Sequence, residues 1–154
     1  MSLETEIKQT RPFQSESEKC IVNITYTNNL ITIFYNKIVK DFDISIEQYN
    51  VLRILKGQNG APITINGIIE RMLDKMSNAS RLVDKLYYKG LVERKQKENN
   101  RRACDVTITP KGEAVLKQVN QNLNERIASS LNMEDAELQK LNTLLDKFRE
   151  KLMS

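Results

Sequence analysis

The stretch Ser77-Asn-Ala-Ser-Arg-Leu-Val-Asp-Lys-Leu-Tyr-Tyr-Lys-Gly90 predicts one helix with a polar start and a defined end. Ser77 is a suitable N-cap, because its hydroxyl can accept a free backbone N–H of the first turn. Leu82, Val83 and Leu86 form an apolar stripe at helical spacing. Gly90 marks the end, because glycine enters the left-handed conformation at little cost. The other side chains are mostly polar or basic, so the helix presents hydrogen-bonding groups on its exposed face.

A β-hairpin is predicted directly after this helix. Two segments, 91–96 and 103–109, have the composition of strands, and the second alternates apolar and polar residues. Between them lies the polar tip Lys97-Glu-Asn-Asn-Arg-Arg102, which is too highly charged to be buried. The hairpin therefore carries a pair of arginines at its exposed end.

Positive charge is concentrated in this part of the chain. Residues 71–102 contain ten basic and four acidic residues, a net charge of +6, whereas the whole chain carries +4 and the remainder therefore −2. A local excess of this kind is typical of a surface that faces nucleic-acid phosphates. A solvated surface hairpin is the simpler alternative, and charge alone does not separate the two.

The order of helix, glycine and arginine-tipped hairpin favours recognition of double-stranded DNA. The helix can offer side chains to base edges in the wide major groove, and the arginines can enter the narrow, electronegative minor groove. The residues predicted to contact DNA are Ser77, Asn78, Ser80, Arg81, Lys85, Arg101 and Arg102.

The same residues resemble the multiple-antibiotic-resistance regulator (MarR) family of winged-helix repressors. The segments Ser80-Arg-Leu-Val-Asp-Lys-Leu86, Gly90-Leu-Val-Glu-Arg94, Asn100-Arg-Arg-Ala103 and Ile108-Thr-Pro-Lys-Gly112 occur in the order and at the spacing of that family. The similarity runs from about Leu30 to the C-terminus. It implies a homodimer that binds a pseudo-palindromic operator as a repressor and is released by a small aromatic or phenolic effector. Asn100 stands where the family usually has an aspartate, so the tip arginines lack a carboxylate partner there.

The preceding part of the chain predicts three helices. Residues 18–40 have a broad apolar face that needs more than one neighbour, which fits the dimerisation helix of the resembled family. Ser45 and Gln48 form a capping box at the start of the second helix, which ends near Gly57. Thr64 is expected to cap a third helix, which together with the helix from Ser77 makes a helix-turn-helix.

Two more helices are predicted after the hairpin. Thr109 is an N-cap followed by Pro110 at the first helical position, and this helix runs to about Leu131. Asn132 is expected to cap the last helix. The fold class is therefore mainly α with a small β-hairpin: a winged helix-turn-helix with dimerisation helices at both ends. The expected parts are an N-terminal arm (1–17), a dimerisation helix (18–44), the winged helix-turn-helix (45–109) and C-terminal dimerisation helices (110–154).

Composition weakens most enzymatic alternatives. The 154 residues include no histidine, and the five glycines form no phosphate-binding loop. We therefore expect neither catalysis nor a metal or cofactor. The sequence contains no segment of membrane-span length and no apolar signal core, which predicts a cytoplasmic protein.

Two alternative functions stay open. Cys20 lies near the start of the first long helix, where some regulators of the resembled family sense peroxide, so a redox switch is one alternative; an inert thiol is the simpler reading. The second is a winged helix used for protein–protein assembly. The predicted effector site would use Tyr26, Tyr49 and Arg53, for which core packing is the competing interpretation.

Overall fold

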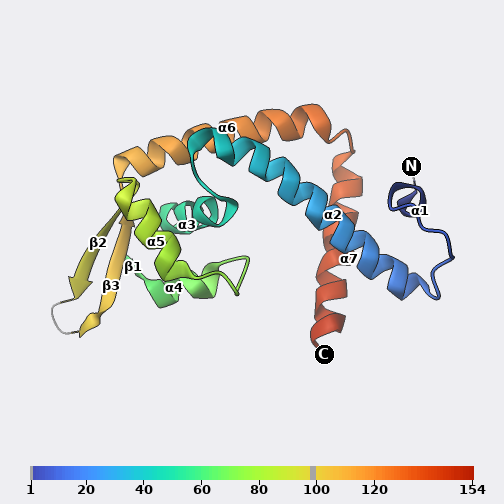
Figure 1. The fold of residues 1–154 in the computed structure, drawn as a ribbon, viewed down its shortest axis with the longest axis horizontal. Coiled ribbons are helices and arrows are strands. Elements are labelled where there is room, and N and C mark those ends of the chain that lie inside the picture. Colours follow the sequence, from blue (N-terminus) through green and yellow to red (C-terminus); the bar gives the residue numbers. More distant parts are fainter. Residues whose placement is uncertain (1, 98–99) are drawn as a thin grey trace. The chain divides into compact units, whose positions relative to one another are not determined.

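The computed structural model describes residues 2–97 and 100–154, and for residues 97 and 100–103 it describes the backbone. The chain forms two compact units, residues 1–120 and 121–154. The helices and strands are α1 (Leu3–Glu6), α2 (Glu16–Val39), the 3-10 helix η1 (Lys40–Phe42), α3 (Ile46–Lys56), β1 (Ile63–Thr64), α4 (Ile65–Arg71), α5 (Ala79–Tyr88), β2 (Val92–Lys97), β3 (Asn100–Ile108), α6 (Pro110–Ser130) and α7 (Asp135–Met153) (Figure 1). The predicted class, mainly helical with a small sheet, is confirmed.

Local capping groups set the start of three helices as the sequence predicts. Ser45 Oγ accepts from the backbone N–H of Gln48, and Gln48 Oε1 accepts from the N–H of Ser45, which completes the capping box of α3. Thr64 Oγ1 accepts from the N–H of Gly67 at the start of α4. Thr109 Oγ1 accepts from the N–H of Gly112 at the start of α6. Each bond satisfies a backbone donor that the first helical turn leaves without a partner.

The hairpin of β2 and β3, hereafter the wing, is longer than predicted. The strands pair antiparallel, and the pairing extends to Lys97 and Asn100. The predicted tip of residues 97–102 is therefore wrong in its bounds, because Asn100, Arg101 and Arg102 belong to β3. The prediction ended the strands where apolar and polar residues stop alternating. Backbone hydrogen bonds between strands do not need this alternation, so the pairing continues into the polar segment.

A third strand joins the wing and was not predicted. β1 pairs antiparallel with β3, with Ile63 opposite Val106, so the sheet order is β1-β3-β2. β1 has only two residues, which is too short for an alternating pattern to be recognised. This strand ties the start of α4 to the base of the wing.

The core of the first unit lies between its helices and the base of the sheet. Ile38 of α2, Leu52 of α3, Ile68 of α4 and Leu86 of α5 are fully buried. Val106 of β3 is fully buried as well, so helices and sheet share one apolar interior. Burial of these side chains stabilises the position of α5, whose other face stays in solvent.

The start of α7, in the second unit, differs from the prediction. Its N-cap is Glu134, which forms a capping box with Glu137, and Asn132 lies outside the helix. The prediction at Asn132 is wrong because a glutamate pair at the same spacing supplies both cap hydrogen bonds.

Gly112 of α6 sits against the end of α5 and the start of the wing. A Cβ atom at this position would overlap the carbonyl oxygen of Leu91 and lie 2.9 Å from Cγ1 of Ile108. The absence of a side chain therefore sets how closely α6 approaches these two segments.

We expect Gly112→Ala to lower the free energy of unfolding by about 2 kcal/mol, since backbone must move to admit the methyl group. Gly57→Ala is the matched control. Gly57 has a right-handed backbone, and its nearest atom would be 3.4 Å from the new Cβ. Urea unfolding of both variants measures the difference, and equal stability of the two would contradict the close packing at Gly112.

Candidate nucleic-acid interface

The start of α5 is capped by Asn78 instead of Ser77. Asn78 Oδ1 accepts from the backbone N–H of Arg81 at 3.0 Å. Ser77 Oγ donates to Asp74 Oδ2 at 2.7 Å and so belongs to the preceding turn. The prediction of Ser77 as N-cap is wrong because Asp74 engages its hydroxyl and the next residue offers an equally good acceptor.

The turn before α5 is held by several hydrogen bonds. Asp74 also accepts from the backbone N–H of Met76, and these bonds, that of Ser77 first, lower the pKa of the Asp74 carboxyl. The N–H of Leu73 donates to Asn50 Oδ1 on α3. Lys75 Nζ donates to the carbonyl oxygen of Glu70 at the end of α4. The geometry between α4 and α5 is thus fixed by side chains of the turn.

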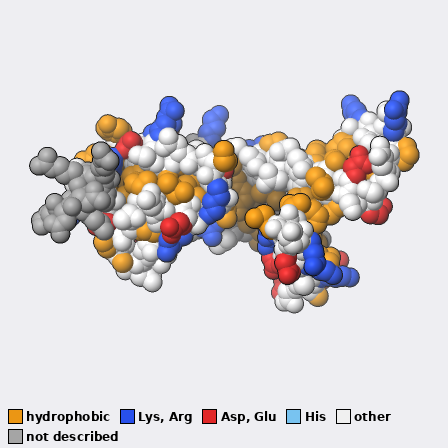
Figure 2. Space-filling model, turned by 90° about the horizontal axis from the view of Figure 1, so that it is seen from below, with side chains coloured by type: hydrophobic (Ala, Val, Ile, Leu, Met, Phe, Trp, Pro, Cys, Tyr) orange, Lys and Arg blue, Asp and Glu red, His pale blue; other side chains and the backbone are white. Residues whose placement is uncertain are grey.

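This ordered turn displays two apolar side chains. Leu73 is 83% exposed and Met76 is 93% exposed. Figure 2 views the first unit from the side of α4, and hydrophobic side chains reach that surface beside Lys and Arg side chains. Neither residue was predicted from the sequence, although apolar residues inside a polar turn are a usable signal of a contact surface.

The two faces of α5 differ sharply. Ala79, Val83 and Leu86 are buried, whereas Leu82 of the predicted stripe is only half-buried. The predicted contact residues on this helix, Asn78, Ser80, Arg81 and Lys85, are all exposed. Asn78, Arg81 and Lys85 follow each other at intervals of three and four residues, so they lie along one line of the helix surface.

The end of α5 is set by Gly90, as predicted. Its backbone is left-handed, with φ of 70°. The N–H of Gly90 donates to the carbonyl oxygen of Tyr87, and the N–H of Leu91 donates to that of Leu86. This pair of bonds is the Schellman arrangement, and Leu91, the residue after Gly90, is buried. The chain is thereby turned from α5 into the wing.

An ion pair joins α5 to the wing. Arg94 of β2 donates to Asp84 of α5, and its Nε donates to Cys104 Sγ on β3 at 3.4 Å. The bond to Cys104 and the charge of Asp84 raise the pKa of Arg94. Arg94 therefore helps to position the wing. The side chains of Arg101 and Arg102, the predicted minor-groove residues, lie outside the described part of the wing.

The predicted effector residues are only partly brought together. Tyr49 and Arg53 of α3 meet, with the Arg53 guanidinium carbon 5.8 Å from the ring centre of Tyr49. Tyr35 of α2 joins them, its ring centre 6.3 Å from that of Tyr49. Burial raises the pKa of Tyr49, whose hydroxyl donates to Asn120 Oδ1 at 2.7 Å. Tyr26 is half-buried farther toward the N-terminus of α2.

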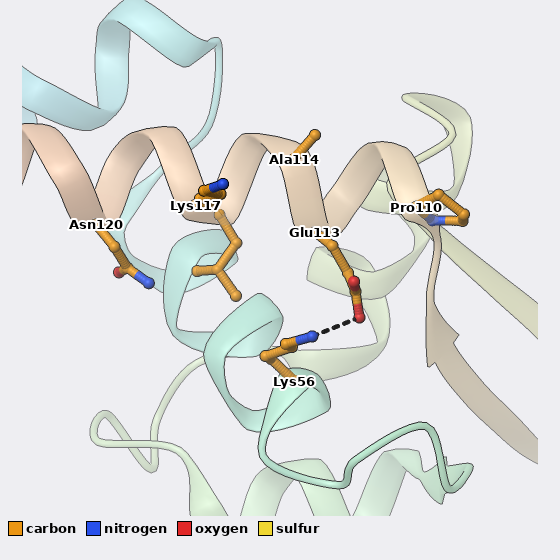
Figure 3. Close-up of a pocket in the computed structure, with 7 residues that line it drawn as sticks. Lys56, Pro110, Glu113, Ala114, Lys117 and Asn120 are labelled. Carbon is orange, nitrogen blue, oxygen red and sulfur yellow. Dashed lines mark hydrogen bonds and ion pairs between the residues drawn. The ribbon is translucent and has the colours of Figure 1, made fainter.

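A groove of about 480 Å³ runs between α3 and α6 beside this aromatic group. Lys56 of α3 points toward Glu113 of α6, and the two form an ion pair of 2.9 Å (Figure 3). Asn120, the partner of Tyr49, also lines the groove, but none of the predicted effector residues does. The groove is therefore mainly the contact region of α3 and α6, and it is not the predicted effector site.

Cys20 is exposed near the start of α2. Lys19, the adjacent cation, pairs with Glu4 of α1 at 2.5 Å, and this bond lowers the pKa of Glu4 to about 2. The cation next to Cys20 in the sequence is therefore already paired. The redox role of Cys20 stays a prediction.

The part of the chain that the structure describes contains no group of histidine, cysteine and acidic side chains arranged to hold a metal ion. Among the described helices, none combines the length and the apolar character needed to cross a bilayer.

A helix pair joined by a fixed turn and followed by a hairpin at the end of the second helix defines a winged helix-turn-helix protein. Residues 44–104 match the model of the MarR family. This match covers the helix-turn-helix and most of the wing, and it makes the chain similar to a family of transcriptional regulators.

Individual relatives agree with this assignment. The HTH-type transcriptional regulator MgrA of Staphylococcus aureus is 24% identical over 114 residues, which cover 74% of this chain and 76% of MgrA. The crystal structure of a MarR-like regulator from Bacillus cereus superimposes with a TM-score of 0.78 at 24% identity, covering 88% of this chain and 97% of that one. The structure of Bordetella bronchiseptica BpsR, whose DNA binding is regulated by 6-hydroxynicotinic acid, gives a TM-score of 0.70 at 19% identity and covers 90% and 97%.

We expect Asn78→Ala to lower the free energy of unfolding by about 1 kcal/mol, because the first turn of α5 loses its cap. Asn78→Asp should keep most of the stability, because a carboxylate accepts the same N–H and suits the positive end of the helix. Urea unfolding measures both. A larger loss for Ser77→Ala than for Asn78→Ala would show that the cap is misassigned.

Proposed function

We propose that this transcriptional regulator is a homodimeric repressor that binds a specific, pseudo-palindromic DNA duplex. The observation that carries the proposal is the contrast on α5, where one face is sealed into the core and the other presents Asn78, Ser80, Arg81 and Lys85 to solvent. In the proposal, α5 enters the major groove and reads base edges, while Arg101 and Arg102 of the wing reach the flanking minor groove.

The exposed turn before α5 fits the same position. Leu73 and Met76 are apolar and exposed, their backbone N–H groups are held by hydrogen bonds, and they lie just before the reading helix. Thymine offers a C5 methyl group in the major groove, and apolar side chains are its usual partners. These two residues are therefore suited to contact A·T pairs beside the bases that the polar residues read.

Two surfaces support a homodimer. In the first unit, α2 leaves Ile21, Ile31 and Ile33 about half exposed. In the second unit, α7 has an apolar stripe but no buried residue, and Leu144 is more than half exposed. Apolar surface of this extent is suited to pairing with a second copy. We assign dimerisation to residues 18–44 and 110–154, the winged helix-turn-helix to residues 45–109, and an arm to residues 1–17.

Release of DNA by a small aromatic effector is the finer part of the proposal. The relative BpsR responds to 6-hydroxynicotinic acid, an aromatic anion. In this chain, Tyr35, Tyr49 and Arg53 form an aromatic group with an adjacent cation. An arginine beside aromatic rings suits an aromatic acid, because the rings stack and the guanidinium pairs with the carboxylate. Tyr26 of α2 is the remaining residue proposed for this site.

Selection of bound duplexes from a random pool tests the proposal directly. We expect enrichment of two related half-sites about 10 base pairs apart, because paired recognition helices enter successive major grooves on one face. A gel shift at two ionic strengths should show weaker binding at higher salt. A chain that binds no duplex at either ionic strength would instead favour the alternative of a protein-interaction module.

The wing is tested by Arg101→Gln combined with Arg102→Gln. We expect the double variant to lose at least about tenfold in affinity and to show a salt dependence that is flatter by about two charges. Lys140→Gln on α7 removes a charge far along the chain and serves as the control. Affinity that is unchanged in the double variant would contradict the minor-groove role.

A further inference from the structure

A second pocket, of about 470 Å³, lies beside the C-terminal end of α5. Its lining comes from the end of α2, the turn after η1, the start of α3 and the last turns of α5. It shares no lining residue with the groove beside α6 and none with the proposed effector residues. Lys40, Lys85 and Lys89 bring three positive charges to it, and Asp43 brings one negative charge.

The acidic residue is already neutralised. Lys89 Nζ lies 2.9 Å from Asp43 Oδ2, and it also donates to the carbonyl oxygen of Asp43. Asp43 has a left-handed backbone, with φ of 54°, so this double contact holds the turn between η1 and α3 in place. The ammonium groups of Lys40 and Lys85 have no hydrogen-bond or ion-pair partner among the described residues. The pocket thus has one lysine engaged in an ion pair and two lysines without a partner among the described residues.

Gln48 adds an amide donor to the same pocket. Its side-chain oxygen accepts from the N–H of Ser45 in the capping box, and the residue is only 4% exposed. The described residues include no fully enclosed side-chain nitrogen or oxygen without a partner, so the Gln48 amide nitrogen, which has no acceptor among them, stays accessible at the pocket wall. An accessible donor of this kind can bind an acceptor of a ligand in place of water.

Three lysines and the Gln48 amide dominate the polar lining, although Asn36, Ser45 and the paired Asp43 also bring acceptor oxygens, and the net charge of the lining is about +2. A phosphate group provides several acceptor oxygens and a charge of about −2 as a monoester near pH 7. We propose that this pocket binds a phosphate group. The source is either a small phosphate compound or a backbone phosphate of bound DNA, and the chemistry of recognition is the same for both.

The position of Lys85 connects the pocket to DNA binding. Lys85 continues the exposed line of Asn78 and Arg81 along α5 and also lines the pocket. The DNA part of the inference rests on the proposed function, whereas the binding of a free phosphate compound does not. The two sources can therefore be separated by experiment.

The variant Gln48→Glu tests the pocket without removing the cap of α3. Glutamate at this position completes a capping box as well as glutamine does, but it replaces the amide N–H donor with an acceptor that repels phosphate. Lys40→Gln removes one of the two available cations. The controls are Gln139→Glu, the same chemical change on an exposed position of α7, and Lys117→Gln, the same charge change in the other groove.

The first measurement is calorimetric titration of the full-length chain with inorganic pyrophosphate at low salt. If the pocket takes a free phosphate compound, the native chain binds, both pocket variants bind at least about tenfold more weakly, and both controls match the native chain. Gln48→Glu should unfold in one cooperative transition with a midpoint well above the temperature of the titration, which separates loss of the donor from loss of folding; a somewhat lower midpoint than that of the native chain is expected from the cost of burying a carboxylate.

The second measurement is the affinity for a selected DNA duplex as a function of salt. If the pocket takes a backbone phosphate, the native chain ignores pyrophosphate, while Gln48→Glu and Lys40→Gln weaken duplex binding about tenfold and reduce its salt dependence, and the controls do not. Absence of both effects overturns the inference. If the native chain binds no duplex, the proposed function fails, and the pyrophosphate titration alone decides the pocket.

Discussion

The close approach of α6 to the end of α5 is the constraint on which the interface depends. Gly112 lies against the carbonyl oxygen of Leu91, Thr109 Oγ1 donates to the carbonyl oxygen of Gly90, and Lys111 Nζ donates to that of Lys89. The end of α5, both ends of the wing and the start of α6 meet at this joint. Two of these bonds satisfy carbonyl oxygens that the last turn of α5 leaves without helical partners. A shift at the joint would therefore change the angle between α5 and the wing.

The same joint explains why the exposed face of α5 can be so polar. Few residues of α5 are buried, so its own apolar contacts give it limited stabilisation. The cap at Asn78, the Schellman turn at Gly90 and the ion pair of Asp84 with Arg94 fix it at both ends and along one side. The side chains on its exposed face are therefore not needed to hold the helix in place. They are available to contact DNA, as a recognition helix requires.

Signals that act within a few residues were predictable from the sequence. The capping box of Ser45 and Gln48, the cap at Thr64 and the start at Pro110 depend on neighbouring residues alone, and all three were confirmed. The two wrong helix caps have a similar cause, because at Ser77 and at Asn132 another good cap lies within two residues. The Ser77 hydroxyl is bound to Asp74, and Glu134 forms a capping box with Glu137.

Features made by distant segments were not predictable. Strand β1 exists because Ile63 pairs with Val106 of β3. The contact of Lys89 with Asp43 links residues that are 46 positions apart in the chain. Neither leaves a periodic pattern. The identity of the candidate interface was nevertheless accessible, because a reading helix and its wing are adjacent in the chain and carry their charge in one segment.

The shared use of Lys85 has a thermodynamic consequence. If a free phosphate compound and the duplex both need the ammonium group of Lys85, each weakens the binding of the other by the same factor, because coupling between two ligands is reciprocal. The strength of this effect depends on how much of the phosphate affinity comes from Lys85 instead of Lys40 and Gln48, which line the pocket but do not belong to α5. A pocket in which Lys40 and Gln48 dominate would bind phosphate with little effect on DNA. A pocket in which Lys85 dominates would act as a direct competitor of the duplex backbone, without any change in the fold.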